Sequence, residues 1–347
     1  MVPLFGQPVM EHCIRLLAKH GVDDIIVTIS HMAEEITDYF GDGSDWDVKI
    51  RYSVEDDPRG TAGGIKLLQN MIDGPFMVVS GDAVTDFDLT AAKEYHKSKS
   101  AIATLVVHRV DDPTEYGLVA TSHDGRVIRF LEKPKSEQIF TNIVNTGIYI
   151  LEPEVLSCIP YEEVYDFSRH LFPRLLRNQE PVFACELDGY WCDIGNLTQY
   201  RNAHYDALLG KANLDIGGKE VAKGIWLGED VEIHKSVKLA APVFVGEGTD
   251  VRRNVILGGC SVIGDESLVD EGASISRSIL GSGTFIGRAT NVTDCVIGNG
   301  YHVLDQMSVQ NRVIVDGAEK QMYPIWDLPD DVAPEPERRW VSHTIAA

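Results

Sequence analysis

The stretch Val251-Arg-Arg-Asn-Val-Ile-Leu257-Gly-Gly-Cys-Ser-Val-Ile263-Gly-Asp-Glu-Ser-Leu-Val269 places a large aliphatic residue at every sixth position. The same spacing runs through Leu227, Ile233, Leu239, Val245, Val251, Leu257, Ile263, Val269 and Ile275. Four positions after each of these stands a small or β-branched residue. A helix repeats about every 3.6 residues and an alternating strand every two, so neither produces this period. The repeat predicts short parallel strands joined by tight corners and stacked as a parallel β-helix.

The repeat continues beyond Ile275 but slips by one residue at two points. Its further inward positions are Leu280, Ile286 and Val292, and then Ile297, Val303, Val309 and Val315. We expect irregular corners or shortened sides at the slips. The pattern resembles the hexapeptide signature of the left-handed kind of β-helix.

Glycine directly follows the inward residue at Gly228, Gly246, Gly258 and Gly264. We expect these glycines to keep the turns tight by adopting positive φ, which only glycine does cheaply. A coil of this kind defines an architecture and leaves the reaction open, so the chemistry has to be sought elsewhere in the chain.

Composition limits the kinds of partner. The 347 residues are too many for one ordinary core, so two domains are expected. The formal net charge of −22 argues against nucleic acid and against an anionic membrane surface, since both select clustered positive charge. No apolar run approaches the length of a membrane span, and the N-terminus has no signal-peptide pattern. Six cysteines without paired or zinc-like spacing favour reduced thiols and a cytoplasmic protein.

Residues 1–210 read as alternating helices and strands. Helical patterns cover residues 9–20, 32–40, 62–71 and 89–98, and strand patterns cover 25–29, 48–54, 76–80 and 101–110. Such alternation implies parallel crossovers and an open, Rossmann-like sheet covered on both faces. Further on, a hairpin centred on 124–125, a strand at 143–151 and helices at 166–176 and 197–209 are expected.

These patterns divide the chain into four parts. The predicted α/β domain spans 1–210, and a linker follows at 211–224. The β-helix is expected over 225–317. The remaining segment, 318–347, is rich in Pro, Asp and Glu and is expected to be an irregular tail.

Two acidic residues follow predicted strands in distant parts of the α/β domain. The strand at 76–80 runs into Gly81-Asp82, and Asp193 stands in Gly189-Tyr-Trp-Cys-Asp193-Ile-Gly. Ligands of open parallel sheets bind at the carboxyl ends of strands. Two carboxylates there would suit Mg²⁺, which prefers oxygen ligands and bridges protein acids to phosphates. The alternatives are an ordinary turn at Asp82 and a helix cap at Asp193.

Two further segments could contact an anionic sugar or nucleotide. Glycines between 60 and 64 open a helix, and they would let a ligand approach its positive N-terminus. Glu132 and Lys133 end a strand side by side; the acid could accept sugar hydroxyls, and the lysine could meet a phosphate. A solvated Glu–Lys pair is the alternative.

Seven motifs stand in order along the chain. They are Pro-Arg-Gly-Thr-Ala-Gly at 58–63, Ser-Gly-Asp-Ala-Val-Thr-Asp-Phe-Asp-Leu at 80–89, Glu-Tyr-Gly-Leu-Val at 115–119, Phe-Leu-Glu-Lys-Pro at 130–134, Val-Asn-Thr-Gly-Ile-Tyr-Ile at 144–150, Asp-Phe-Ser at 166–168, and Gly-Tyr-Trp-Cys-Asp-Ile-Gly at 189–195. Together they resemble the sugar-1-phosphate nucleotidyltransferase family, in particular the mannose-1-phosphate guanylyltransferase type that carries a C-terminal hexapeptide coil.

The resemblance implies a reaction and a set of site residues. A sugar-1-phosphate, with mannose favoured, attacks the α-phosphate of a nucleoside triphosphate, with GTP favoured, and pyrophosphate leaves. Catalysis then rests on aligning two anions and neutralising their charge. By resemblance, Asp82 and Asp193 hold Mg²⁺, Lys133 meets the sugar phosphate, Gly117, Glu132 and Asn145 line the sugar site, and Gly60, Thr61, Ala62, Gly63 and Asp82 contact the nucleotide.

One departure from the family pattern concerns the first residues. Members normally begin with a strand and a loop of the form G-G-x-G-T-R-L-x-P-L-T, followed by Lys-Pro, whereas this chain opens at the position after that Lys-Pro. We expect either a 5′-truncated reading of a longer gene or a non-catalytic regulatory paralogue that binds sugar nucleotide. Without that strand, the strands near Ile25 and Phe76 are expected to flank an empty slot.

The coil allows two further interpretations. Many hexapeptide coils are acyltransferases, and His234 and His302 lie in the repeat, but no long insertion interrupts the regular run. The other role is assembly, because flat parallel sides make a homo-oligomer through the β-helix plausible.

Overall fold

A computed structural model describes residues 1–161 and 163–315. These residues form two compact units. The first contains Met1 and Val9–Asp193, and the second contains Val2–Pro8 and the chain from Ile194 onward. The tail expected at 318–347 lies outside the described residues.

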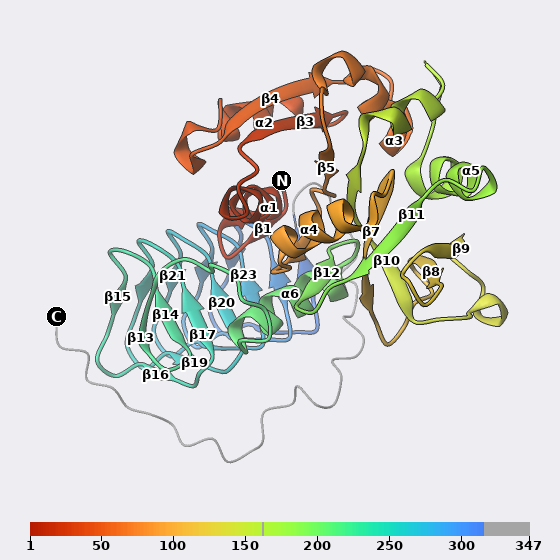
Figure 1. Cartoon of the computed structure of the whole chain (residues 1–347). Helices are drawn as coiled ribbons and strands as arrows, with labels where there is room; N and C mark the ends of the chain where they lie inside the picture. Colours follow the sequence, from red (N-terminus) through yellow and green to blue (C-terminus); the bar gives the residue numbers. More distant parts are fainter. Residues whose placement is uncertain (162, 316–347) are drawn as a thin grey trace. The chain divides into compact units, whose positions relative to one another are not determined.

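The first unit is an α/β unit whose elements follow the expected order (Figure 1). Its helices are α1 (Val9–Lys19), α2 (Ala33–Phe40), α3 (Gly60–Leu67), α4 (Leu89–Lys99) and α5 (Phe172–Arg177). Its strands are β3 (Asp24–Ile29), β4 (Lys49–Val54), β5 (Phe76–Val78), β6 (Ala83–Thr85), β7 (Ala103–Arg109), β8 (Gly117–Thr121), β9 (Val127–Glu132), β10 (Ile143–Leu151), β11 (Val182–Glu186) and β12 (Trp191–Asp193). A π-helix over Phe167–Leu171 precedes α5 directly.

The main sheet is mixed, where the helix–strand alternation predicted a parallel one. Its order is β11-β7-β10-β8-β9, and β5 pairs with β10. Only β11 runs parallel to its neighbour, because the β8–β9 hairpin returns the chain and leaves β10 antiparallel to β5, β7 and β8. The parallel pair β3–β4 forms a separate sheet, and β3 and β5 share no ladder within the described residues.

Helices cover both faces of the main sheet, as expected. Strand β7 shows this by alternation: Leu105 and Val107 join a core with Phe167 and Phe172, while Val106 joins a core with Leu89 of α4. All six side chains are buried. Successive residues of a strand point to opposite faces, so one strand supplies two cores.

The second unit is a parallel β-solenoid with three sheets (Figure 1). Its parallel strands are β14 (Ile225–Leu227), β15 (Glu232–Ile233), β16 (Lys238–Leu239), β17 (Val243–Val245), β18 (Asp250–Val251), β19 (Ile256–Leu257), β20 (Ser261–Ile263), β21 (Leu268–Val269), β22 (Ser274–Ser276), β23 (Ile279–Leu280), β24 (Phe285–Ile286), β25 (Asn291–Thr293), β26 (Val296–Ile297), β27 (His302–Val303), β28 (Ser308–Gln310) and β29 (Val313–Ile314). An antiparallel strand, β13 (Lys219–Ala222), pairs with β14.

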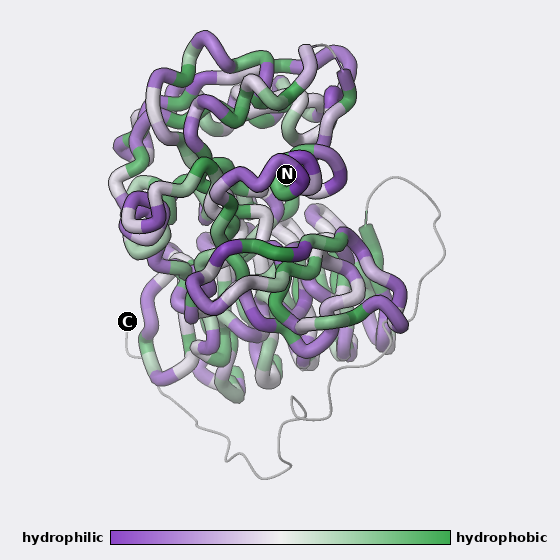
Figure 2. The backbone as a smooth tube through the Cα atoms, turned by 45° about the vertical axis from the view of Figure 1, so that its right-hand side comes forward, coloured by the Kyte–Doolittle hydropathy of each residue, from purple (hydrophilic) through white to green (hydrophobic). Residues whose placement is uncertain are grey.

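The predicted inward residues form the solenoid core. Val251 pairs with Ile233 on one side and with Val269 on the other, so one coil takes eighteen residues. From Leu239 to Ile275 the predicted inward residues are buried, and Leu227 and Ile233 pack against them at the first coil. Figure 2 shows hydrophobic and hydrophilic stretches alternating along these turns. The hexad spacing therefore predicted the core correctly.

The slips in the repeat shorten one corner of each later coil. Ile263 pairs with Leu280, Leu280 with Ile297, and Ile297 with Ile314. This places Ile314 against the core and leaves Val315 half exposed, so the inward position predicted for Val315 is wrong. The sequence slips once more than we expected.

The glycines of the turns act by close approach and not by the positive φ that we expected. Gly246 is outside the positive-φ region, and so are its counterparts at 228, 258 and 264. A Cβ atom on Gly246 would lie 2.6 Å from the Asp265 backbone nitrogen of the next coil. Side chains at this position would push neighbouring coils apart.

The solenoid unit includes two segments from outside the repeat. The hairpin of β1 (Pro3–Leu4) and β2 (Gln7–Pro8) buries Phe5, whose ring centroid lies 5.3 Å from that of Phe244. Helix α6 (Leu197–Leu208) is tied by the Tyr205 hydroxyl, which donates to the Arg277 carbonyl at 2.6 Å. The domain boundaries expected from sequence remain a prediction. Among the helices of the described residues, none is long and apolar enough to cross a membrane.

Candidate functional site

A pocket of about 180 Å³ in the α/β unit gathers most of the predicted site residues. Its lining includes Asp82, Gly117, Glu132, Lys133, Asn145 and Asp193. These six come from the ends of β8, β9 and β12, the bend of β10 and the turn before β6. Ser80, Tyr116, Thr146 and Trp191 also line it, and sequence reasoning assigned no role to them.

Antiparallel pairing brings the two predicted acids together. Strand β12 pairs with β6 so that Asp193 lies opposite Ala83, the residue after Asp82. The Ser80 hydroxyl donates to Asp82 Oδ1 at 2.5 Å and holds that carboxylate at the pocket. Burial raises the pKa of Asp193, the charge of Asp82 raises it further, and Lys133 acts in the opposite direction. Burial disfavours the charged form of Asp193, and the like charge of Asp82 disfavours it further.

These two carboxylates fit a metal ion that is held jointly with a substrate. Within the described residues, no group of three or more His, Cys, Asp or Glu side chains could hold a metal alone. Mg²⁺ commonly takes only one or two protein carboxylates and completes its shell with water and substrate phosphates. The donor set at Asp82 and Asp193 matches that pattern.

Glu132 presents a partly unsatisfied carboxylate to the same pocket. Its Oε2 atom is buried and has no hydrogen-bond partner. Desolvation raises its pKa, the charge of Asp166 adds to this, and a hydrogen bond with Ser168 opposes it. Gly117 lies opposite Glu132 in the β8–β9 ladder, and a Cβ there would lie 2.6 Å from Oε2. Glycine at 117 therefore leaves room for the Glu132 carboxylate.

Asn145 and Lys133 occupy irregular backbone next to Glu132. The β7–β10 register shifts between Asn145 and Tyr149, and the Asn145 amide nitrogen donates to the Tyr149 hydroxyl at 2.8 Å. Lys133 has φ of 43° and donates its backbone N–H to the Tyr116 carbonyl at 3.1 Å. Non-glycine residues with positive φ are uncommon and cluster at functional sites.

The segment Gly60–Gly63 does not line this pocket. The backbone N–H groups of Ala62 and Gly63 both donate to the Tyr165 carbonyl, at 3.0 and 2.9 Å. A Cβ on Gly60 would lie 2.7 Å from that carbonyl oxygen. These glycines therefore serve a close packing of two backbones, and the nucleotide contacts predicted for the segment stay a prediction.

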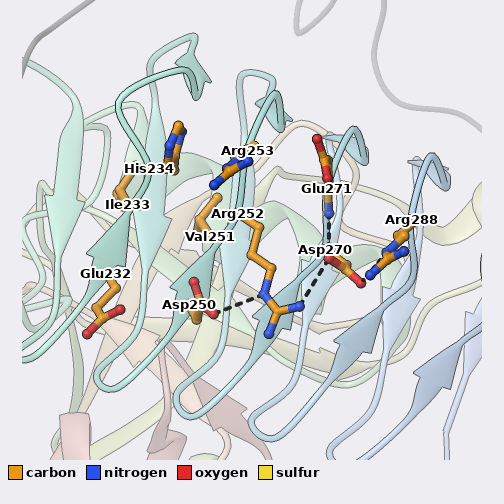
Figure 3. A pocket seen from close by; sticks show the side chains of 10 residues that line it. All are labelled: Glu232, Ile233, His234, Asp250, Val251, Arg252, Arg253, Asp270, Glu271 and Arg288. Atoms are coloured by element: carbon orange, nitrogen blue, oxygen red, sulfur yellow. Dashed lines mark hydrogen bonds and ion pairs between the residues drawn. The ribbon is translucent and has the colours of Figure 1, made fainter.

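The solenoid carries a pocket of about 330 Å³ in which two aspartates are paired with arginines (Figure 3). Figure 3 shows Arg252 between Asp250 and Asp270. Arg252 lies 3.2 Å from the first carboxylate and 3.3 Å from the second, and Arg288 reaches Asp270 at 3.3 Å. His234, which we considered as an acyltransferase base, has Nδ1 at 2.8 Å from the Ser236 hydroxyl. Asp250 and Asp270 therefore each have an arginine partner in this pocket.

Comparison with known proteins agrees with the two units. Residues 1–209 match the family described as Nucleotidyl transferase, and residues 221–322 match the GMPPB C-terminal domain. A UTP–glucose-1-phosphate uridylyltransferase from Synechocystis is 36% identical, covering 87% of this chain and 82% of the relative. Mannose-1-phosphate guanylyltransferase 1 from Arabidopsis thaliana is 30% identical, covering 92% and 90%.

Solved structures agree with the first unit. HddC from Yersinia pseudotuberculosis has a TM-score of 0.51 and 27% sequence identity, and the match covers 58% of this chain and 87% of HddC. The family match extends over more than half of the chain and the curated relatives over nearly all of it. The chain therefore belongs to the sugar-1-phosphate nucleotidyltransferase family.

Proposed function

We propose that this chain transfers a nucleoside monophosphate group from GTP to mannose-1-phosphate and releases pyrophosphate. The carrying observation is the pocket in which Asp82, Asp193, Glu132 and Lys133 converge. The guanine preference is supported by the guanylyltransferase relatives, by the GMPPB C-terminal domain match, and by the HddC structure complexed with GMP-PN.

Each residue of the pocket has a proposed task. Lys133 holds the sugar phosphate as a point charge, which leaves one phosphate oxygen free to attack the α-phosphorus. Glu132 Oε2 accepts a sugar hydroxyl, and this supplies the partner that the buried oxygen lacks. Asn145 lines the same side of the pocket. These contacts fix the orientation of the attacking sugar phosphate.

The electrophilic side is assigned to the two aspartates and to the segment Gly60–Gly63. Members of this family generally use a divalent metal ion, and we propose Mg²⁺ held by Asp82 and Asp193. When bound, such an ion neutralises phosphate charge and polarises the reacting phosphoryl group. The P–O bond to the β-phosphate breaks as the sugar phosphate bonds to the α-phosphorus, and pyrophosphate carries away the electron pair. Thr61 is the residue of 60–63 whose side chain is exposed to approach base or ribose.

A second substrate pair has its own support. The uridylyltransferase relative is 36% identical, more than the 30% of the guanylyltransferase from Arabidopsis. UTP with glucose-1-phosphate is therefore the alternative. The enzyme would discriminate between the two substrate pairs through contacts to the base edge and to the sugar hydroxyls. Guanine and uracil, and mannose and glucose, present different hydrogen-bond donors and acceptors to such contacts.

The setting of the reaction is also part of the proposal. All six cysteines are free, and we propose a reducing cytoplasm as the location. We assign the solenoid an assembly role, with homo-oligomers formed through its flat sides. Sedimentation equilibrium of the full chain tests assembly, and a strictly monomeric species at micromolar concentration would exclude it.

A pyrophosphate-release assay tests the activity. GTP, UTP, ATP and dTTP are each paired with mannose-1-phosphate and with glucose-1-phosphate in the presence of Mg²⁺. We expect release with GTP and mannose-1-phosphate, and a nucleotide sugar of matching mass. Faster release with UTP and glucose-1-phosphate would favour the alternative pair. No release with any pair would contradict the proposed function.

A further inference from the structure

A short segment, Asp166–Ser168, connects the two sides of the proposed site. On the nucleotide side, the Thr61 hydroxyl donates to Asp166 Oδ2 at 3.2 Å. The same hydroxyl oxygen accepts the Phe167 backbone N–H at 3.1 Å. Thr61 is thereby joined to residues more than a hundred positions away in the chain.

On the sugar side, the Ser168 hydroxyl meets two residues of the pocket. Asn145 Nδ2 donates to Ser168 Oγ at 3.3 Å, and Ser168 is hydrogen-bonded to the Glu132 carboxylate. A hydroxyl has one proton to donate and two lone pairs to accept with. Ser168 accepts from Asn145 and donates to Glu132, so it orients both groups and leaves Glu132 Oε2 without a partner.

The segment itself has little freedom. Asp166 Oδ1 accepts the backbone N–H groups of Ser168 and Arg169 at 2.9 and 3.2 Å and caps the π-helix that starts at Phe167. One carboxylate thus contacts Thr61 through Oδ2 and fixes Ser168 through Oδ1. A π-helical turn is rare and occurs frequently at functional sites.

We propose that the Asp166–Ser168 segment is a positioning bridge that couples Thr61 on the nucleotide side to Glu132 and Asn145 on the sugar side. The inference rests on the proposed function, and it adds that the two substrates bind cooperatively. When a nucleotide orders Thr61, the bridge holds Ser168 in place, and the sugar phosphate then meets a pre-oriented carboxylate. Coupling of this kind is reciprocal, because each ligand must change the affinity of the other by the same factor.

Calorimetric titration of the full chain tests the bridge. Mannose-1-phosphate is titrated with and without a GTP analogue that has a methylene group between its α- and β-phosphates, so that no turnover occurs. We expect the analogue to tighten sugar-phosphate binding about tenfold, a typical coupling factor. Thr61→Val should remove this tightening and leave the affinity for sugar phosphate alone within about twofold.

Variants at Ser168 sharpen the test. Ser168→Ala should weaken sugar-phosphate binding even without the analogue and should also lose the tightening. Ser168→Thr and Thr61→Ser keep their hydroxyls and should retain it. Thr61→Val with Ser168→Ala should behave like Ser168→Ala alone, since both act through one chain of contacts. Ser157→Ala is the matched control, because the Ser157 hydroxyl bonds only the nearby Glu154 carbonyl, at 2.7 Å.

Three results would overturn the inference. They are full tightening in Thr61→Val, equal loss in Ser157→Ala, and strictly additive losses in the double variant. A wild-type chain that binds neither ligand and releases no pyrophosphate is a different result, which defeats the proposed function and the bridge with it. Thermal unfolding of each variant separates a lost bridge from a lost fold.

Discussion

The pocket at Asp82 and Asp193 and the solenoid pocket are built from the same kinds of charged side chain but differ in how their buried carboxylates interact. In the solenoid, burial of Asp270 acts to raise its pKa. Hydrogen bonds from the Glu271 amide, Arg252 and Arg288 outweigh burial, and the pKa of Asp270 is lowered. In the α/β unit, the pKa values of Glu132 and Asp193 are raised, chiefly by burial.

Size does not identify the site, because a third pocket, whose lining includes Gly21, Phe76 and Lys93, is larger than both at about 500 Å³. The solenoid pocket measures about 330 Å³ against about 180 Å³, but its two aspartates, Asp250 and Asp270, are paired with arginines. The smaller pocket retains a buried oxygen without a partner and two acids close enough to repel. Groups left in such a state mark the place where a ligand completes the structure.

Removal of divalent metal should have the largest effect. Chelation with EDTA is expected to lower pyrophosphate release by about 10³-fold or more, because the phosphate charge is then opposed mainly by Lys133. Added Mg²⁺ should restore the rate. The thermal midpoint should change little. Full activity after exhaustive chelation would contradict the assignment of Asp82 and Asp193.

A core substitution in the solenoid should damage stability without touching the chemistry. Leu257 is fully buried, and Leu257→Ala should cost about 2–5 kcal/mol of unfolding free energy in denaturant titrations. Leu304→Ala, at a side chain that is 68% exposed, serves as the control and should cost less than about 0.5 kcal/mol. A lower kcat for folded Leu257→Ala would show that the two regions are not separable.

Glu132→Gln should stabilise the protein by about 1 kcal/mol at neutral pH while lowering activity. The pKa of Glu132 is raised above its ordinary 4.5, so the folded state binds its proton more tightly than the unfolded state does. Protonated Glu132 therefore stabilises the fold below pH 4.5, and this contribution to the unfolding free energy is lost as the pH rises. The gain of the variant should therefore disappear at acidic pH in thermal unfolding scans. A gain that grows on acidification would reverse the sign that we derive.

The smallest effect is expected in the solenoid pocket. Arg252→Ala removes an exposed guanidinium from Asp270, which keeps Arg288, so the loss should stay below about 1 kcal/mol and shrink further at high salt. Pyrophosphate release should remain unchanged. A tenfold loss of activity, measured under matched folding conditions, would contradict the claim that the solenoid pocket takes no part in the reaction.

Sequence patterns predicted the features that depend on the burial of nearby residues. The inward aliphatic residues followed from spacing because each coil must fill the same core, and the position of Asp82 followed from the strand that precedes it. What depends on distant partners was missed. Gly60 is glycine because the Tyr165 carbonyl lies against it, and Ser168 contacts Asn145 and Glu132. The hydrophobic periodicity of a sequence does not predict contacts between segments that lie a hundred residues apart.

The most direct test of the account compares one acid from each pocket. The kcat of pyrophosphate release with GTP and mannose-1-phosphate is measured for Asp193→Asn and for Asp250→Asn under identical conditions. We predict a loss of about 10³-fold for the first, with unchanged or higher thermal stability, and a rate within about twofold of wild type for the second. Equal rates in the two variants, or a larger loss at Asp250, would contradict the claim that the chemistry lies in the smaller pocket.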